Sequence, residues 1–205
     1  MSSREMEADV ARASEVPMSH QLETLAQWRG HETRRNTLNT LRVAVLIAST
    51  ITMGLTAGVF TLYAHTVMPG LGRTDDRTFV GAFQSMDKAI INPWFMAGGF
   101  VGALVFTALA VALHLGEDWR SILPWVGAAL ALCFVAFVIT IGVNVPLNDA
   151  LKGAGSPDRI ADLASVRERF NEAKWTSWHL VRTVTTVGAF GCLTWALVLF
   201  GRATR

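Results

Sequence analysis

The sequence has 205 residues, of which 51% are hydrophobic and only 17% are charged, and its formal net charge is +2. A soluble domain usually carries about 25% charged residues, so this composition favours a membrane protein with one domain of ordinary size. A net charge this small gives no electrostatic reason to expect a nucleic-acid partner.

The charged residues are distributed unevenly and leave four long apolar stretches. No Asp, Glu, Lys or Arg occurs in residues 43–72, 89–116, 121–148 and 183–201. Each stretch approaches or exceeds the roughly 20 residues that a helix needs to cross a bilayer. None has the charged stripe of a surface helix in a soluble protein. The sequence therefore predicts an all-α, membrane-spanning, antiparallel four-helix bundle over residues 41–201. The predicted spans are 41–68, 93–115, 122–143 and 179–200.

Residues 1–40 form a polar leader without the apolar run of a signal peptide. We therefore expect the N-terminus to stay in the cytoplasm and the first span to act as an uncleaved anchor. Four spans would return the C-terminus to the same side of a plasma or inner membrane. The basic residues of the two sides are nearly equal in number, so the positive-inside rule does not decide the orientation.

A first helical segment outside the membrane is predicted after the first span, which Pro69 and Gly70 should end. Thr74, Asp75 and Asp76 suit an N-cap followed by acidic first-turn residues. An apolar stripe then continues toward the second span. Its members are Phe79, Phe83, Met86 and Ile90.

A second such segment is predicted before the last span. Ser156 and Pro157 suit the start of a helix, and no residue that breaks helices follows before Gly188. A single helix over residues 157–200 would be roughly 65 Å long, about twice the hydrocarbon thickness, so its first half must project beyond the membrane. Its apolar face should pack on the first segment and form a helical cap at one end of the bundle. That face comprises Ile160, Leu163, Val166 and Phe170.

Polar residues concentrate at this same end of the predicted bundle. In an antiparallel bundle, the end of the first span, the start of the second, the end of the third and the start of the fourth lie together. Polar side chains at membrane depth are costly, so they usually mark a function or a buried partner. The candidate site residues are Tyr63, His65, Asn92, Asn144, Asn148, Trp175, Trp178, His179 and Arg182.

His179 and Arg182 lie three residues apart and therefore on one helix face. Each also has a structural interpretation, Arg182 as an interfacial arginine whose charged end reaches water and His179 as a hydrogen-bonding histidine. Trp175 and Trp178 suit either an interfacial aromatic belt or an aromatic pocket. Asp149 is expected either to pair with His179 or Arg182 or to be a solvated carboxylate.

Asn144 and Asn148 flank Pro146 at the end of the third span. Proline disturbs the carbonyl four residues before it, and asparagine side chains can satisfy backbone groups that are freed in this way. The alternative is that both carboxamides point into a cavity. His65 has a similar alternative, as a solvated histidine at the membrane interface.

Two motifs resemble a known family. Residues 144–148 (NVPLN) and 175–182 (WTSWHLVR) are similar to segments of the anthrone oxygenase-like family of four-helix membrane proteins, most of which have no assigned reaction. The glycine-rich first span and the amphipathic stretch before Asn92 also fit. The resemblance covers about residues 43–200 and leaves out the polar leader.

The resemblance implies oxidation of an anthrone to an anthraquinone by O2, with no flavin or haem. We then expect His179 to remove the ring-methylene proton as a general base. Arg182, with Asn144 or Asn148, would stabilise the resulting anion. The remaining candidates would contact a flat, apolar substrate. They are Trp175, Trp178, Asn92, Tyr63 and His65.

Two other interpretations remain open. The protein could be a non-enzymatic accessory protein that binds a lipid or a partner protein, in which case the polar cluster is structural. It could also be a metal-dependent oxidoreductase that uses His65 and His179, although two histidines make a sparse metal site. No metal or organic cofactor is predicted. The expected partners are the lipid bilayer, O2 as co-substrate and an apolar small molecule, and a homo-oligomer is compatible with the sequence.

Overall fold

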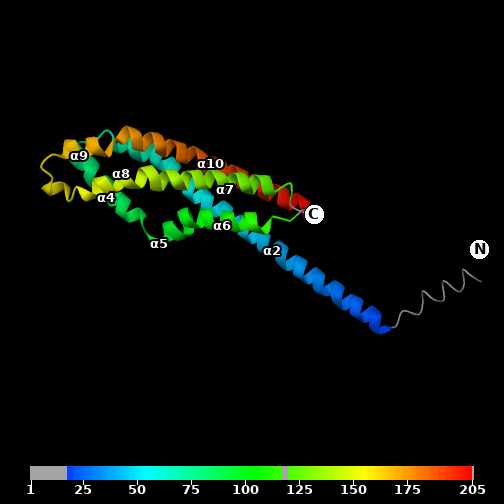
Figure 1. The fold of residues 1–205 in the computed structure, drawn as a ribbon. Helices are drawn as coiled ribbons and strands as arrows, with labels where there is room; N and C mark the ends of the chain where they lie inside the picture. The colour runs from blue at the N-terminus through cyan, green and yellow to red at the C-terminus, as the bar shows by residue number, and fades with distance from the viewer. Residues whose placement is uncertain (1–17, 117–119, 205) are drawn as a thin grey trace, which may run out of the picture. The chain divides into compact units, whose positions relative to one another are not determined.

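The computed structural model describes residues 18–116 and 120–204, and these residues contain helices, turns and loops but no strand. By packing, the chain divides into two units, Met1–Leu41 and Arg42–Arg205. The described residues of the first unit belong to the start of α2 (Met18–Leu62). The second unit contains the helical bundle (Figure 1). The first 17 residues of the predicted polar leader lie outside the described residues.

Within the described residues, four segments are long and apolar enough to cross a membrane, which confirms the predicted all-α class and its four apolar spans. These segments are Gln27–Leu71, Pro93–Leu113, Leu123–Gly153 and Leu163–Ala203. Their helices after α2 are η1 (Tyr63–Val67), α3 (Met68–Leu71), α5 (Pro93–Phe95), η2 (Met96–Phe100), α6 (Val101–Leu113), α7 (Leu123–Ile139), η4 (Thr140–Asn144), α8 (Val145–Gly153), α9 (Leu163–Phe170) and α10 (Glu172–Ala203).

Small residues allow the helices of the bundle to approach one another closely. In the second unit α10 packs along α7, which also packs against α6, and consecutive spans run in opposite directions (Figure 1). Close backbone approach is the usual basis of helix association in lipid, where apolar side chains gain little by leaving the surrounding hydrocarbon. The small residues of this core are Ala103, Ala110, Ala129, Ala189 and Ala196.

The predicted helical cap is present at one end of the bundle. It consists of α4 (Asp76–Ile90), the short turn η5 (Pro157–Arg159) and α9. Phe83 of α4 contacts Phe170 of α9 edge to face, with ring centroids 4.7 Å apart. Asp75 accepts hydrogen bonds from the backbone and the hydroxyl of Thr78, and these bonds hold the pKa of the Asp75 carboxyl below its ordinary value. The helix therefore begins within the expected run 74–76, with Asp75 as the cap and Asp76 in the first turn, and the expected packing between the two segments is confirmed.

Arg167 of α9 connects several parts of the cap. Its guanidinium donates to the carbonyl oxygens of Thr74 and Gly72, at 2.9 and 3.2 Å. It also pairs with Asp76 and Glu172, at 3.1 Å each. The same group lies 4.3 Å from the centroid of the Phe79 ring. A single cation therefore joins the loop after the first span, the start of α4 and the start of α10.

The prediction of one unbroken helix over residues 157–200 is wrong. The chain forms the turn η5, then α9, and then α10 after a break at Asn171. Asn171 has a left-handed backbone (φ 53°), and its side chain accepts a hydrogen bond from the backbone N–H of Lys174 at 3.1 Å. Asparagine tolerates this conformation better than other residues with a side chain, so it can end one helix and cap the next. The break lets α9 fold onto α4.

Three of the spans contain a wide π-helical turn at their capped ends. These turns are η1, η2 and η4. Both η1 and η4 end two residues before a proline, Pro69 and Pro146 respectively. Proline lacks a backbone N–H and its ring collides with the carbonyl four residues back, and a wider turn relieves both problems. The prolines therefore shape the helices where the polar candidates lie.

We expect Gly102→Ala to destabilise the protein, because an ideal Cβ there would lie 2.1 Å from the carbonyl oxygen of Ala97 in the preceding turn. The clash is with backbone, so the helix itself must shift. A cost of about 2 kcal/mol would lower the melting temperature in detergent by about 4–8 °C. The matched control is Gly98→Ala, whose Cβ would meet only Trp94 at 3.8 Å. Equal melting temperatures for the two variants would contradict the assignment of this close contact.

We expect Arg167→Ala to loosen the cap, since it leaves two backbone carbonyls and two carboxylates without their cation. The loss should be about 2 kcal/mol. Limited proteolysis of the purified protein should show faster cleavage between α9 and α10. The control is Arg169→Ala, because the Arg169 side chain is exposed and donates to the Ser165 carbonyl of its own helix. Indistinguishable cleavage rates for the two variants would show that Arg167 does not hold the cap.

Candidate functional site

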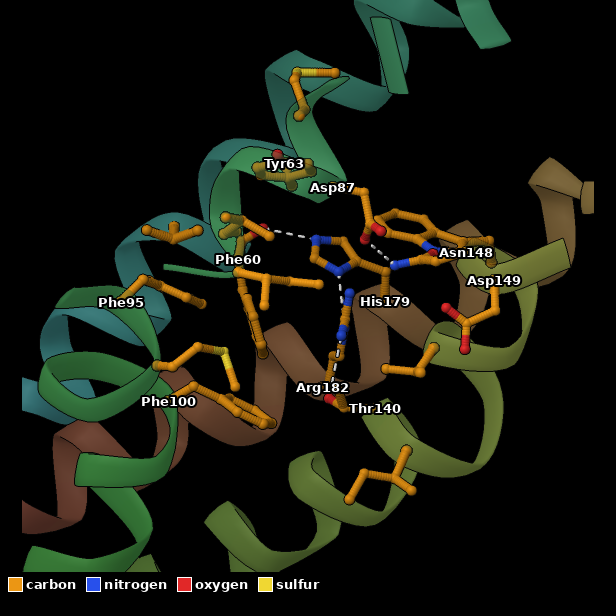
Figure 2. Close-up of a pocket in the computed structure, with 18 of the residues that line it drawn as sticks. Phe60, Tyr63, Asp87, Phe95, Phe100, Thr140, Asn148, Asp149, His179 and Arg182 are labelled. Atoms are coloured by element: carbon orange, nitrogen blue, oxygen red, sulfur yellow. Dashed lines mark hydrogen bonds between the residues drawn. The ribbon is translucent and has the colours of Figure 1, made fainter. Parts of the chain in front are cut away.

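A cavity of about 360 Å³ lies between the capped ends of the spans and α4 (Figure 2). This volume falls within the range of small-molecule sites, roughly 300–1,000 Å³. Its walls are mainly aromatic and aliphatic, and each of the three π turns contributes at least one lining residue. The aromatic residues of the wall are Phe60, Tyr63, Phe83, Phe95, Phe100, Phe137 and Trp175.

His179 is held at both ring nitrogens. Nε2 lies 2.8 Å from the carbonyl oxygen of Phe60, and Nδ1 lies 2.9 Å from Nε of Arg182. A guanidinium can only donate, so Nδ1 accepts from Arg182 and the ring proton sits on Nε2, which donates to Phe60. The ring stacks on Trp175 with centroids 4.7 Å apart, and only 1% of the residue is exposed. His179 is therefore a neutral ring whose lone pair is already used.

Arg182 is a buried cation that lines an apolar cavity. The residue is 7% exposed. Besides His179, its guanidinium donates to Thr140 Oγ1 at 3.1 Å and lies over the Phe60 ring, 4.5 Å from the centroid. Within residues 18–116 and 120–204, no carboxylate forms an ion pair with Arg182. A buried cation without a counter-ion is costly, so this site favours an anionic or strongly electron-rich ligand.

Asn148 connects α8, α10 and α4. Its side-chain oxygen accepts from the indole N–H of Trp175 at 2.7 Å, and its Nδ2 donates to Asp87 Oδ1 at 2.6 Å. Trp175, the residue that stacks on His179, is 2% exposed. Asn148 thus fixes the wall of the cavity through Trp175 and orients a carboxylate at its rim.

The carboxylate of Asp87 is paired with Lys152. Lys152 Nζ lies 2.9 Å from Asp87 Oδ2 and also 2.9 Å from Asp149 Oδ1. Asp149 therefore pairs with Lys152, one turn later on α8, and not with His179 or Arg182. Its side chain is 60% exposed, which agrees with the alternative of a solvated carboxylate.

The structure brings some of the predicted site residues together and leaves others apart. Tyr63, Asn148, Trp175, His179 and Arg182 all line the cavity. Asn144 is fully buried behind it, where its Nδ2 donates to the carbonyl oxygen of Trp175 at 3.2 Å. Its contact is with the backbone of α10 and not with a carbonyl that Pro146 frees, so the residue joins two helices and does not point into the cavity.

Three predicted substrate contacts lie away from the cavity wall. His65 is exposed, and its Nδ1 lies 2.6 Å from the hydroxyl of Thr66. Trp178 is 41% exposed on the outer face of α10. Asn92 caps α5 by accepting a hydrogen bond from the backbone N–H of Phe95 at 2.9 Å. His65 and Trp178 lie on exposed helix faces outside the cavity, and the side chain of Asn92 is used to cap α5.

Sequence reasoning missed Asp87, Lys152 and Thr140. Asp87 had a usable signal, because it follows Phe79 and Phe83 by eight and four residues and so continues the apolar face of α4. A carboxylate on such a face needs a partner. Lys152 and Thr140 gave no such signal, because their roles depend on contacts with other helices.

No cluster of three or more His, Cys, Asp or Glu side chains that could hold a metal ion occurs in the described part of the chain. The proposed pair of His65 and His179 is not assembled in the cavity, since His65 is outside it and both nitrogens of His179 have protein partners.

Comparison with known proteins supports the family that the two motifs indicated. The sequence model of the anthrone oxygenase family matches residues 92–192. The match includes α5 to most of α10, and with them both motifs, but not α2 or α4. No curated protein and no solved structure matches the chain. The chain is a member of the anthrone oxygenase-like family.

Proposed function

We propose that the protein is a membrane oxygenase that oxidises a flat phenolic aromatic compound with O2, converting a ring methylene to a carbonyl. In the net reaction the methylene and one O2 give the carbonyl and one water, so no external reductant is needed. The observation that carries this proposal is that Arg182 is buried in an aromatic-walled cavity and has no carboxylate partner in the described part of the chain. Membership of the family supports the reaction type.

The proposed role of Arg182 is to stabilise negative charge on the substrate oxygen. Loss of a methylene proton from an anthrone-like ring gives an anion whose charge is delocalised onto that oxygen. A preorganised cation in a site that excludes water stabilises such charge much better than water does. The electron-rich anion then reduces O2, so this route requires no metal or organic cofactor.

The proposed role of His179 differs from the general base expected from the sequence. Its Nδ1 lone pair accepts from Arg182, and its Nε2 proton is bonded to the Phe60 carbonyl. In this geometry the ring holds the guanidinium in position and has no free lone pair for the substrate. We therefore assign His179 a positioning role.

A lipid with an anionic head group could also bind to Arg182, so the buried arginine supports the accessory-protein interpretation as well. A turnover assay distinguishes an enzyme from a lipid-binding protein. A lipid-binding protein would bind fatty acid through Arg182 and would not consume O2 in the presence of an anthrone. For the enzyme we also propose the location expected from the sequence, a plasma or inner membrane with cytoplasmic N- and C-termini.

We expect Arg182→Gln to lower kcat/KM for anthrone oxidation by about 100-fold or more, because the cation that stabilises the anion is removed. Oxygen uptake and quinone absorbance with protein in lipid nanodiscs would measure this. The control is Arg159→Gln, at an exposed position outside the cavity. A wild-type rate for the Arg182 variant would rule out the proposed site, and a wild-type protein that consumes no O2 with any anthrone would rule out the function.

Two variants of His179 distinguish positioning from general-base catalysis. In His179→Asn the amide oxygen takes the place of Nδ1 and can still accept from Arg182, but it cannot hold a proton. We expect this variant to keep kcat within about tenfold of wild type, whereas His179→Leu should lose about 100-fold or more. Equal, large losses in both variants, with melting temperatures retained, would restore the general-base role.

A further inference from the structure

Asp87 is the buried carboxylate on the cavity wall, with 9% of the residue exposed. Its Oδ1 accepts the 2.6 Å hydrogen bond from Asn148. Its Oδ2 is buried and forms an ion pair with Lys152 Nζ, 2.9 Å away. A carboxylate oxygen has two lone-pair positions, so each oxygen of Asp87 keeps one position that these contacts do not use and that can serve a ligand in the cavity.

The other groups on this wall are less suited to accept a proton. His179 has no free lone pair, and Arg182 is always charged. The Asp149 side chain is 60% exposed, so water competes with any substrate for it. The titratable and charged groups that face Asp87 across this cavity are Lys152 and Asp149 of α8, Tyr63 of η1, and His179 and Arg182 of α10.

Asp87 and Arg182 approach the cavity from different helices, α4 and α10, and no ion pair joins them. Asp87 is paired with Lys152, while Arg182 has no carboxylate partner among the described residues. The cavity thus offers a base and a cation at separate positions. This arrangement suits a substrate that loses a proton at one atom and gains negative charge at another.

We propose that Asp87 is the proton acceptor of the reaction, an inference that rests on the proposed function. One C–H bond of the ring methylene breaks, the proton goes to Asp87 Oδ2, and the electron pair stays on the ring, with charge on the oxygen that faces Arg182. The ring carbon transfers two electrons to O2 in forming a C–O bond. Asp87 returns its proton to the resulting peroxide anion, and loss of water from the hydroperoxide leaves the carbonyl.

The test compares Asp87→Asn with wild type in nanodiscs, with anthrone as substrate. Asparagine keeps the shape and one acceptor oxygen, so anthraquinone binding and the melting temperature should be retained. We expect kcat to fall by about 100-fold or more. A matched control is Asp158→Asn, because Asp158 is an exposed carboxylate of the cap that pairs with Arg77 outside the cavity.

A rise in pH separates a proton acceptor from a merely structural residue. Once the solution is alkaline enough to ionise anthrone by itself, the base is no longer required, so Asp87→Asn should recover most of the wild-type rate. Arg182→Gln should not recover under the same conditions, because the anion still lacks its cation. Unchanged kcat in Asp87→Asn at neutral pH overturns the inference while an active wild type preserves the proposed function. Loss of rate without alkaline recovery also overturns it.

Lys152→Met provides a second test if Asp87→Asn cannot be obtained folded. The carboxylate stays in place but loses the cation with which it is paired. We expect kcat to fall at neutral pH and to recover as the pH is raised. Wild-type kcat for this variant across the pH range would also overturn the role of Asp87.

Discussion

The buried charge of Arg182 is the constraint on which the site depends. A guanidinium cannot lose its charge, and in a bundle made to lie in hydrocarbon it cannot be left without partners. The protein satisfies it with a neutral ring, a hydroxyl and an aromatic face, from His179, Thr140 and Phe60. These groups hold the cation in place without neutralising it. The positive charge therefore remains available to a ligand.

The fold around this cation separates it from the carboxylates of the same region. Asp87 forms an ion pair with Lys152, and Arg167 forms ion pairs with both Asp76 and Glu172. Each ion pair also joins helices, so the charge arrangement and the cap stabilise each other. Trp175 has a comparable double role, since it packs in the apolar core of the cap, bonds to Asn148 and stacks on His179. A structural change in the cap should therefore alter the position of Trp175 and, through it, the wall of the cavity.

The cavity lies where the helices depart from regular geometry. Pro69 and Pro146 each follow a π turn by two residues, and these turns contribute Tyr63 and Thr140 to the wall. The break at Asn171 also shapes the cavity, because it lets α9 fold back onto α4. α4, held in this way, brings Asp87 to the cavity. The irregular helical turns thus shape the cavity, and the ion pairs hold the helices that surround it.

The sequence by itself determined the four apolar spans, the capped end and the gathering of polar residues there, because hydrophobic length and periodicity are local properties of the chain. It also identified five residues of the cavity wall, Tyr63, Asn148, Trp175, His179 and Arg182. Only the tertiary structure decided that His65 and Trp178 lie outside, that Asp149 pairs with Lys152, and that Asp87 faces the cavity. It also decided the break at Asn171. The left-handed backbone of this residue costs free energy, and it persists only where the packing of the flanking helices offsets that cost. Such pairings depend on distances between residues that are far apart in the chain, as between Phe60 and His179, and no local pattern encodes those distances.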